Sequence, residues 1–367
     1  MSNLRGRAIG GGAGVLRGGL RLVGVGRSQR PAAPKRVLLL KPCCIGDLLF
    51  TTPLLAAISE FWPGAAVDYL AGPHARAAVL GNPHLNEIVD AGLVGAGRYP
   101  WPAMLKLAGV LRRRGYAAAF VPDRSPALAL LALLARIPYR AGLNSGGRGL
   151  GLSVAAPVDD RQPRHEVERY LDVARAAGLS LPSQPKLEYY PDAQAIEQAA
   201  ALLGELGLGS RPLITLNPAG GVNPGTVLKE KRWPLAAWRA LLPRLAALAD
   251  VLVIGGQADI ALAAAVTTGL PAYNIAGRLD LAATGALFQR AALHLGGDTG
   301  TSHLAVACAC RTVAIFGPTS VLQYGLYGPA NLARSLYPVG KQEGGGLTSD
   351  VPVAAVYAAV RELLGDL

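Results

Sequence analysis

The chain has 367 residues, of which 51% are hydrophobic and 16% charged, so it can bury two sizeable cores and is not a disordered protein. The formal net charge is +12, but residues 1–36 hold eight Lys and Arg and no acidic residue. The rest of the chain is therefore ordinary in charge, and we predict no nucleic-acid partner. No run reaches the ~18 apolar residues that a membrane-spanning helix needs.

Residues 1–35 form a basic, Gly-rich N-terminal tail with scattered apolar residues. Glycine disfavours a stable helix here, and no compact apolar core precedes a small-residue cleavage site, so we do not expect a secretory signal. The tail is either a disordered leader or a segment that lies on an anionic membrane surface, which attracts basic residues. We expect a cytoplasmic protein, which in the second alternative is peripheral at the inner face of the cytoplasmic membrane.

From residue 36, short apolar strands alternate with amphipathic helices, a pattern typical of a parallel sheet buried on both faces. Gly178 provides the C-terminal stop of the last helix in this half. The predicted strands are 37–40, 66–70, 87–89 and 117–121, and the predicted helices are 48–60, 104–113, 127–135 and 166–177.

The pattern restarts after a proline-punctuated stretch, with Asp192 as the N-cap of a helix over 192–206. The later predicted strands are 213–216, 251–254, 272–275, 293–295 and 312–316, and the later helices are 235–248, 260–268, 279–289, 301–309 and 351–364. The expected fold class is α/β, with two Rossmann-like doubly wound domains facing across a cleft. The expected divisions are the tail 1–35, domains 36–185 and 186–345, and a C-terminal helix in 346–367.

The four cysteines, Cys43, Cys44, Cys308 and Cys310, do not have the CxxC spacing of zinc or redox sites. We therefore expect reduced, small apolar side chains. No HExxH motif or Cys/His cage is present, so we predict no metal and no bound cofactor.

The first motif, residues 41–53, follows a predicted strand and opens a helix, which places it where ligands of doubly wound sheets bind. Gly46 lets backbone approach a ligand closely, and Thr52 offers a hydroxyl. Asp47 is either an N-cap carboxylate or a general base that takes a proton from an acceptor hydroxyl.

The second motif, residues 296–304, joins a strand to a helix through two glycines and three hydroxyl side chains. Free backbone N–H groups at a helix start bind anions, so we expect a phosphate or diphosphate as the ligand of Thr299, Gly300 and Ser302. Asp298 would repel phosphate, so we expect it to bind sugar hydroxyls or to cap the helix. His303 is interpreted as a packed or capping histidine.

A third motif, residues 217–234, ends in a basic stretch in which Lys231 or Lys229 can meet a phosphate as a point charge. The alternative is a solvated basic loop.

Three further groups are candidates. Gly255 and Gly256 form a strand-end turn before Asp259, which either caps a helix or accepts a hydrogen bond from a ribose or base. Asp123 follows a strand. His165 opens a helix whose charged residues read equally as an exposed face or as substrate contacts.

Together these motifs resemble glycosyltransferase family 9, the heptosyltransferase-type enzymes of two-Rossmann (GT-B) architecture. The resemblance rests on residues 41–53, 81–83, 165–170, 231–234, 298–304 and 316–319. It implies that Asp47 is the catalytic base, that Lys231 contacts the donor phosphate and sugar, and that Asp298, Thr299 and Gly300 bind the donor. It maps the acidic residue after the Gly-Gly turn onto Asp259.

The resemblance further implies a metal-independent, inverting glycosyltransferase that moves a heptose or similar sugar from a nucleotide-diphosphate sugar. ADP-heptose is the expected donor, and a lipopolysaccharide core or another cell-envelope glycan is the expected acceptor. One departure is a loop at 217–233 that is about six residues longer than expected, with Ala219, Gly220 and Gly221 in place of hydroxyl side chains. Two alternatives remain open, a nucleotide-sugar epimerase on the same fold and a catalytically silent glycolipid- or membrane-binding module.

Overall fold

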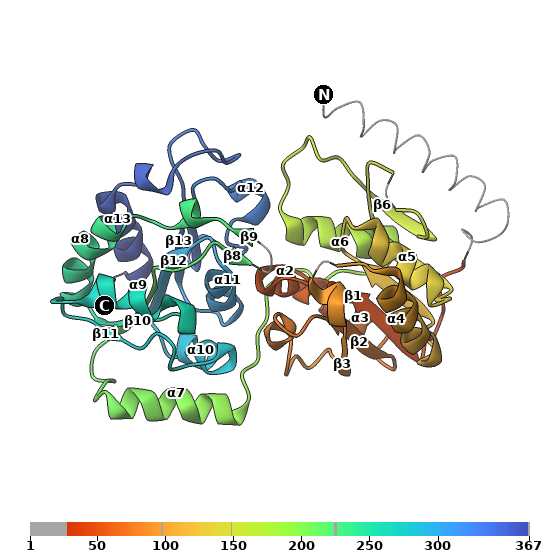
Figure 1. The fold of residues 1–367 in the computed structure, drawn as a ribbon, viewed down its shortest axis with the longest axis horizontal. Coiled ribbons are helices and arrows are strands. Elements are labelled where there is room, and N and C mark those ends of the chain that lie inside the picture. Colours follow the sequence, from red (N-terminus) through yellow and green to blue (C-terminus); the bar gives the residue numbers. More distant parts are fainter. Residues whose placement is uncertain (1–27, 97, 148, 224–225, 366–367) are drawn as a thin grey trace. The chain divides into compact units, whose positions relative to one another are not determined.

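The computed structural model describes residues 28–96, 98–147, 149–223 and 226–365. The chain divides into two compact units, residues 1–185 and 186–367 (Figure 1). Positions 1–27 of the predicted tail lie outside the described residues, so both alternatives for the tail stay predictions. In the described part of the chain, no helix has the length and apolar character needed to cross a bilayer.

The first unit is built on a six-stranded parallel sheet with the order β3-β2-β1-β4-β5-β6. Its strands are β1 (Arg36–Leu40), β2 (Ala66–Ala71), β3 (Glu87–Asp90), β4 (Ala118–Val121), β5 (Tyr139–Ser145) and β6 (Val154–Val158). Its helices are α2 (Ile45–Phe50), α3 (Thr52–Phe61), α4 (Trp101–Arg113), α5 (Pro126–Leu134) and α6 (Glu166–Ala176), with short 3-10 turns η1 (Arg76–Ala78) and η2 (Gly92–Ala96). Since the strand order reverses direction at β1, the topological switch point lies between β1 and β4.

Alternate residues of β1 fill the two faces of this sheet. Leu38 and Leu40 pack in one cluster with residues of α4 and α5. Val37 and Leu39 are equally buried and point to the opposite face, on which α3 and α6 contact each other and the sheet. The continuous apolar run of β1 is therefore explained by burial on both faces, as the sequence predicted.

The predicted helix 48–60 is wrong in its boundaries, because two helices occupy this stretch. Thr51 ends α2 and begins α3, and Pro53 in the first turn of α3 has no N–H with which to continue the α2 ladder. The sequence analysis also missed β5 and β6. β5 contains the buried Arg140, and β6 is an edge strand with Pro157, so neither is a continuous apolar run.

The expectation that all four cysteines are reduced is wrong for one pair. Cys43 and Cys44 are joined by a disulfide across a cis peptide bond, whereas Cys308 and Cys310 are free and buried. The CxxC spacing used in the sequence analysis describes two cysteines separated by a turn, so it does not detect a disulfide between adjacent cysteines.

The second unit repeats the plan, with a six-stranded parallel sheet in the order β11-β10-β7-β12-β13-β14. Its strands are β7 (Leu213–Asn217), β10 (Asp250–Val253), β11 (Tyr273–Asn274), β12 (Leu293–Gly297), β13 (Thr312–Ile315) and β14 (Ala333–Leu336), and a separate hairpin pairs β8 (Val222–Asn223) with β9 (Thr226–Val227). Its helices are α7 (Ala193–Glu205), α8 (Leu235–Ala246), α9 (Ile260–Thr267), α10 (Leu281–Phe288), α11 (Gly300–Ala307), α12 (Val321–Tyr324) and α13 (Val353–Leu364), with 3-10 turns η3 (Lys229–Lys231), η4 (Gln257–Asp259) and η5 (Thr348–Asp350). The switch point here lies between β7 and β12.

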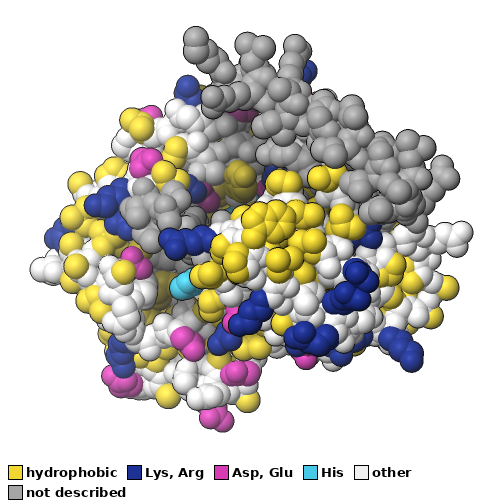
Figure 2. Space-filling model, turned by 45° about the vertical axis from the view of Figure 1, so that its right-hand side comes forward, with side chains coloured by type: hydrophobic (Ala, Val, Ile, Leu, Met, Phe, Trp, Pro, Cys, Tyr) yellow, Lys and Arg dark blue, Asp and Glu magenta, His cyan; other side chains and the backbone are white. Residues whose placement is uncertain are grey.

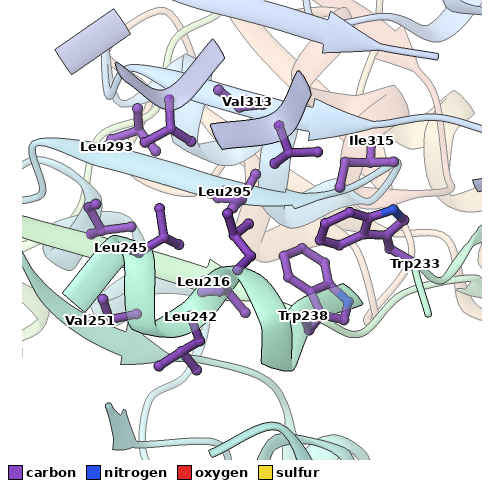
Figure 3. Packing of buried hydrophobic residues seen from close by; sticks show 14 of the residues in the cluster. Leu216, Trp233, Trp238, Leu242, Leu245, Val251, Leu293, Leu295, Val313 and Ile315 are labelled. Carbon is purple, nitrogen blue, oxygen red and sulfur yellow. The ribbon is translucent and has the colours of Figure 1, made fainter. Parts of the chain in front are cut away.

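The core of the second unit gathers Leu216, Leu295 and Ile315 from three neighbouring strands beneath α8 (Figure 3). Trp233 and Trp238 close one end of this core, with ring centroids 4.9 Å apart in an edge-to-face arrangement. The Trp233 indole N–H donates to the carbonyl of Val351. This packing fixes the segment that carries Lys231.

Two predicted helix boundaries hold, the start of α7 in this unit and the end of α6 in the first unit. Asp192 caps α7 by accepting from the backbone N–H of Ala195, and Gly178, with a φ of +72°, follows α6 as expected. The segment 346–367 contributes α13 to the main core of the second unit. The sequence analysis missed β14 and the β8–β9 hairpin, which lies within the long loop at 217–233. The fold class, with two doubly wound α/β units, is confirmed.

Candidate active site

A charged pair marks the switch point of the first unit. Lys41 directly follows β1 and Asp123 closely follows β4, so neighbouring parallel strands deliver both side chains to the same edge of the sheet. The Lys41 ammonium donates to Oδ2 of Asp123 at 2.9 Å, and the other Asp123 oxygen accepts from the backbone N–H of Ser125. Both side chains are thus held by partners within their own unit.

Asp47, in the first turn of α2, is the carboxylate beside this pair. Its Oδ1 accepts a hydrogen bond from the Tyr170 hydroxyl at 2.9 Å and lies 3.6 Å from the Lys41 ammonium. Its Oδ2 accepts a longer bond, 3.4 Å, from the backbone N–H of Cys44. The Asp47 side chain is 34% exposed, so an incoming hydroxyl can reach it. It is the third residue of its helix and not the N-cap that the simpler interpretation expected.

Burial and charge act in opposite directions on Lys41. Burial disfavours its ammonium, but Asp47, Tyr170 and Asp123 outweigh that cost and raise the pKa of Lys41 well above its ordinary value. Burial likewise opposes ionisation of Asp123, yet Lys41 brings the net pKa of Asp123 below its ordinary value. Lys41 and Asp123 are therefore both charged near neutral pH.

Tyr170 lies within this cluster on the buried face of α6. Burial first, and the Asp47 charge second, raise the pKa of its hydroxyl well above the ordinary value, so it remains a hydrogen-bond donor throughout the physiological range. The Lys41 ammonium lies 5.2 Å from the centre of its ring.

The start of α6 is anchored by a second ion pair. Arg124 donates two parallel hydrogen bonds to the buried carboxylate of Glu166, at 2.6 and 2.8 Å. His165 is the N-cap of α6, accepts from the backbone N–H of Val167 through Nδ1, and packs edge-to-face on Phe50 at 5.1 Å. The interpretation of His165, Glu168 and Arg169 as an exposed face does not hold for Arg169, which is buried and donates to the carbonyl of Gln162. The alternative, a contact with substrate, stays a prediction.

The other predicted residues of this motif lie in α2 and α3. Gly46 is in the first turn of α2. Thr52 is fully buried and its hydroxyl donates to the carbonyl of Leu49. Thr52 therefore stabilises the junction between α2 and α3.

In the second unit, Lys231 and Asp298 form the corresponding charged pair. Asp298 follows β12 and is 8% exposed, and Lys231 ends η3. The Lys231 ammonium donates to Oδ2 of Asp298 at 2.7 Å. An ammonium has three N–H groups, and one of them donates to Asp298 here. The others can donate to a second, anionic partner.

The helix start after Asp298 is built as the motif predicted. Thr299 is the N-cap of α11 and its hydroxyl accepts a 3.4 Å bond from the N–H of Ser302. The Ser302 hydroxyl is fully buried and donates to the carbonyl of Gly297. Gly300 is the first helical residue, so Thr299 and not Asp298 caps this helix. His303 is buried, as expected for a packed side chain.

The loop after β7 lies against this helix start. Gly220 has a φ of +131°, and a Cβ at this position would collide with the Thr299 methyl group. The carbonyl of Gly220 accepts from Nε of Arg232, next to Lys231. The small residues in the loop therefore permit a close approach between two backbone segments that flank the Lys231–Asp298 pair.

Gly255, Gly256 and Asp259 follow β10, the strand beside β7. Oδ2 of Asp259 accepts from the backbone N–H of Gly256 at 2.9 Å, so the carboxylate stabilises its own turn. A Cβ on Gly255 would lie 2.8 Å from Cβ of Asp259, so this turn also needs a glycine there, and contact of these residues with a nucleotide stays a prediction.

The sequence analysis assigned no role to Lys41 or Tyr170. A signal existed for Tyr170, since Val167, Tyr170, Leu171 and Ala174 follow the spacing of a buried helix face, on which a tyrosine hydroxyl needs a partner. Lys41 comes directly after an apolar strand, where a buried lysine requires neighbouring carboxylates. Among the described residues, no group of three or more His, Cys, Asp or Glu side chains could hold a metal ion.

Comparison with known protein families matches residues 104–343 to the model of glycosyltransferase family 9 (heptosyltransferase). Among curated proteins, lipopolysaccharide heptosyltransferase 2 of Escherichia coli K12 is 27% identical over 296 residues, which cover 78% of this chain and 83% of that protein.

Two solved structures share the fold. The glycosyl transferase family 9 protein of Veillonella parvula superposes with a TM-score of 0.79 at 21% identity, over 92% of this chain and 99% of that one. The E. coli ADP-heptose lipopolysaccharide heptosyltransferase II superposes with a TM-score of 0.71 at 24% identity, over 90% of this chain and 98% of that one.

Proposed function

We propose that this chain, which belongs to glycosyltransferase family 9, transfers a heptose or a similar sugar from a nucleotide-diphosphate sugar to a hydroxyl of a lipopolysaccharide core or another cell-envelope glycan, with ADP-heptose as the expected donor. The names of the relatives support the donor and the acceptor. The observation that carries the chemistry is the half-exposed carboxylate of Asp47, which Tyr170 and Lys41 hold at the switch point of the first sheet.

In this proposal Asp47 is the general base. Its carboxylate takes the proton of the acceptor hydroxyl as that oxygen attacks the anomeric carbon of the donor. The new C–O bond forms on the face opposite to the bond that breaks, so the configuration inverts, and the electron pair of the broken bond leaves with the diphosphate. The hydrogen bond from Tyr170 orients Oδ1. Among the described residues, Oδ2 accepts only the long bond from Cys44, so it is the freer oxygen.

The donor diphosphate is assigned to the second unit. Lys231 offers two further N–H groups, and the N-terminus of α11 at Thr299, Gly300 and Ser302 offers backbone dipoles, so charge developing on the leaving group is stabilised without a metal ion. Asp298 orients the Lys231 ammonium and has its second oxygen available for a sugar hydroxyl.

The remaining site residues have supporting roles in the proposal. Gly255, Gly256 and Asp259 contribute to the nucleotide side, and Asp259 does so through the turn that it holds. Gly46, Thr52, Asp123 and His165 shape the acceptor side around Asp47. We further propose that the basic tail brings the protein to the inner face of the cytoplasmic membrane, where a lipid-linked acceptor would be found, and removal of residues 1–27 should weaken binding to anionic vesicles.

Asp47→Asn tests the general base. We expect kcat to fall by roughly 10²–10⁴, typical of the loss of a general base, while ADP binding stays unchanged because Asp47 belongs to the acceptor side. The assay is release of ADP from ADP-heptose in the presence of a heptose-deficient lipopolysaccharide core. Asp90→Asn is the matched control, since Asp90 is an exposed carboxylate of the same unit that accepts only a backbone bond, from Gly92. Unchanged turnover in the Asp47 variant would rule the role out.

The same assay separates this proposal from its alternatives. An epimerase rearranges the donor sugar with no acceptor present, whereas a transferase leaves the donor intact until an acceptor hydroxyl is supplied. A silent binding module gives no ADP under either condition.

A further inference from the structure

The first unit carries an exposed apolar surface at one end of α4 that the catalytic proposal does not use. Trp101 and Leu105 of α4 are 60% and 56% exposed, and Leu93 of the adjoining turn η2 is 53% exposed. Tyr99 lies between the turn and the helix and is also exposed. Helix α4 contacts η2, so these side chains come from neighbouring elements, and we call them the α4 patch.

The arrangement on α4 is amphipathic, with a buried and an exposed arc. At about 100° per residue, the buried Met104, Leu107, Ala108 and Leu111 fall within an arc of roughly 100°. Next to this arc, Trp101, Leu105 and Arg112 fall within roughly 40° of one another and are centred about 90° from its middle, whereas Lys106 and Arg113 lie on the face opposite the buried arc. The apolar side chains of the patch therefore project from the unit and do not join its core.

The charge around the patch has a single sign. Between Asp90 and Asp123 the sequence has five Lys and Arg and no acidic residue. Arg114 pairs with Glu87, but Arg98, Lys106, Arg112 and Arg113 are exposed, and none of these four forms an ion pair with a carboxylate of the described chain. On the face drawn in Figure 2, hydrophobic side chains gather beside Lys and Arg side chains.

Exposed Trp and Leu beside cations that form no ion pair in the described chain fit the surface of an anionic bilayer. Tryptophan and tyrosine favour the boundary between lipid headgroups and acyl chains, and Lys and Arg on the same helix are attracted to anionic headgroups. We propose that the α4 patch docks the first unit on an anionic lipid bilayer, with Trp101 and Leu105 inserted at the headgroup boundary and Arg112 and Arg113 on lipid phosphates. This surface is distinct from the N-terminal tail.

Tryptophan fluorescence tests the proposal in the full chain, because Trp101 is a selective reporter. The chain has four tryptophans, and Trp62, Trp233 and Trp238 are buried. The probes are vesicles of phosphatidylcholine with phosphatidylglycerol, made with and without lipids brominated on the acyl chains. We expect anionic vesicles to shift the emission to shorter wavelength and brominated ones to quench it, and we expect Trp101→Phe to bind without the quenching.

Two double variants measure the contributions to vesicle affinity. Arg112→Gln with Arg113→Gln should raise the dissociation constant for anionic vesicles about 25-fold, from the attraction of two basic residues to the surface. Trp101→Ala with Leu105→Ala should raise it about tenfold or more. All four side chains are exposed, so neither variant should lower the urea midpoint. Each double variant has a matched control in the second unit. Arg290→Gln with Lys341→Gln removes two exposed cations, and Tyr273→Ala with Leu347→Ala removes two exposed apolar side chains. Both controls should leave the affinity for vesicles unchanged.

Three results would overturn the proposal. The first is binding to anionic vesicles without quenching of Trp101, which would assign binding to the tail. The second is equal behaviour of the α4 variants and the second-unit controls. The third is a failure to bind anionic vesicles, in which case a change of oligomeric state in the α4 double variants would identify the patch as a protein interface.

Discussion

Tyr170→Phe isolates one hydrogen bond at the proposed base. The ring of Tyr170 is buried and remains in the variant, so its packing and its position near the Lys41 ammonium are kept, and only the hydroxyl that donates to Oδ1 of Asp47 is lost. A hydrogen bond to a charged group contributes roughly 1.5–3 kcal/mol. Asp47 is 34% exposed, and water can replace part of the bond, so we take the lower end, about 1.5 kcal/mol.

The expected change is in kcat, because the bond from Tyr170 positions Oδ1 of the proposed base. Since about 1.4 kcal/mol corresponds to a factor of ten in rate, loss of this hydroxyl should lower kcat by roughly tenfold. ADP binding should stay unchanged, because Tyr170 belongs to the first unit and the diphosphate is assigned to the second.

The assay is ADP release at pH 7 with saturating donor and acceptor, together with urea unfolding at the same pH. Tyr139→Phe is the matched control, because the hydroxyl of Tyr139 is buried in the same unit but donates to the carbonyl of Ala177, away from Asp47. An unchanged kcat in a stably folded Tyr170 variant would refute the positioning role. An equal fall in kcat in the Tyr139 control would do the same.

Three further variants test the two charged pairs and the loop. Asp123→Asn should lower the free energy of unfolding by about 2 kcal/mol at pH 7, measured in urea, because Lys41 loses a charged partner. Since the pKa of Asp123 is depressed in the folded state, its contribution is present above its unfolded value near 4 and is lost as pH falls through the lower folded value, so the difference from the variant should shrink at pH 3. Lys231→Gln should weaken ADP binding by roughly tenfold or more in calorimetry, since a charge-assisted contact to phosphate is removed. Gly220→Ala should lower the free energy of unfolding by about 1–3 kcal/mol and weaken ADP binding, whereas Gly204→Ala, in α7 with open space around it, should be neutral or slightly stabilising.

The sheets were predictable where burial makes a strand uniformly apolar. β1, β4, β7 and β13 have this property, and their predicted positions are confirmed to within a residue or so. β5 was not predictable in this way, because the buried guanidinium of Arg140 interrupts the pattern and is satisfied by the carbonyls of Ile137, Pro138 and Gly151. Those acceptors converge only in the folded chain, and burial lowers the pKa of Arg140.

The residues of the candidate site also fall into those that the sequence predicts and those that depend on the fold. Residues at strand ends, such as Asp298 and Thr299, can be identified as candidates from the sequence, because they come after a predicted strand and before a predicted helix. Tyr170 lies 123 positions from Asp47 and Lys41 lies 82 from Asp123, so their pairing depends on strand order and helix packing. Local spacing cannot supply that information, and it also does not show which oxygen of Asp47 is occupied.

The two charged pairs show how one architecture supports two opposite tasks. Each unit places a lysine and an aspartate at its switch point, Lys41 with Asp123 and Lys231 with Asp298. In the first unit a second carboxylate, Asp47, makes the three groups negative by one charge. In the second unit the pair is neutral, and the N-terminus of α11 adds about half a positive charge, which favours an anion. In the proposed function, a base and a diphosphate site would therefore arise from the same scaffold, through one added carboxylate in the first unit and one helix start in the second.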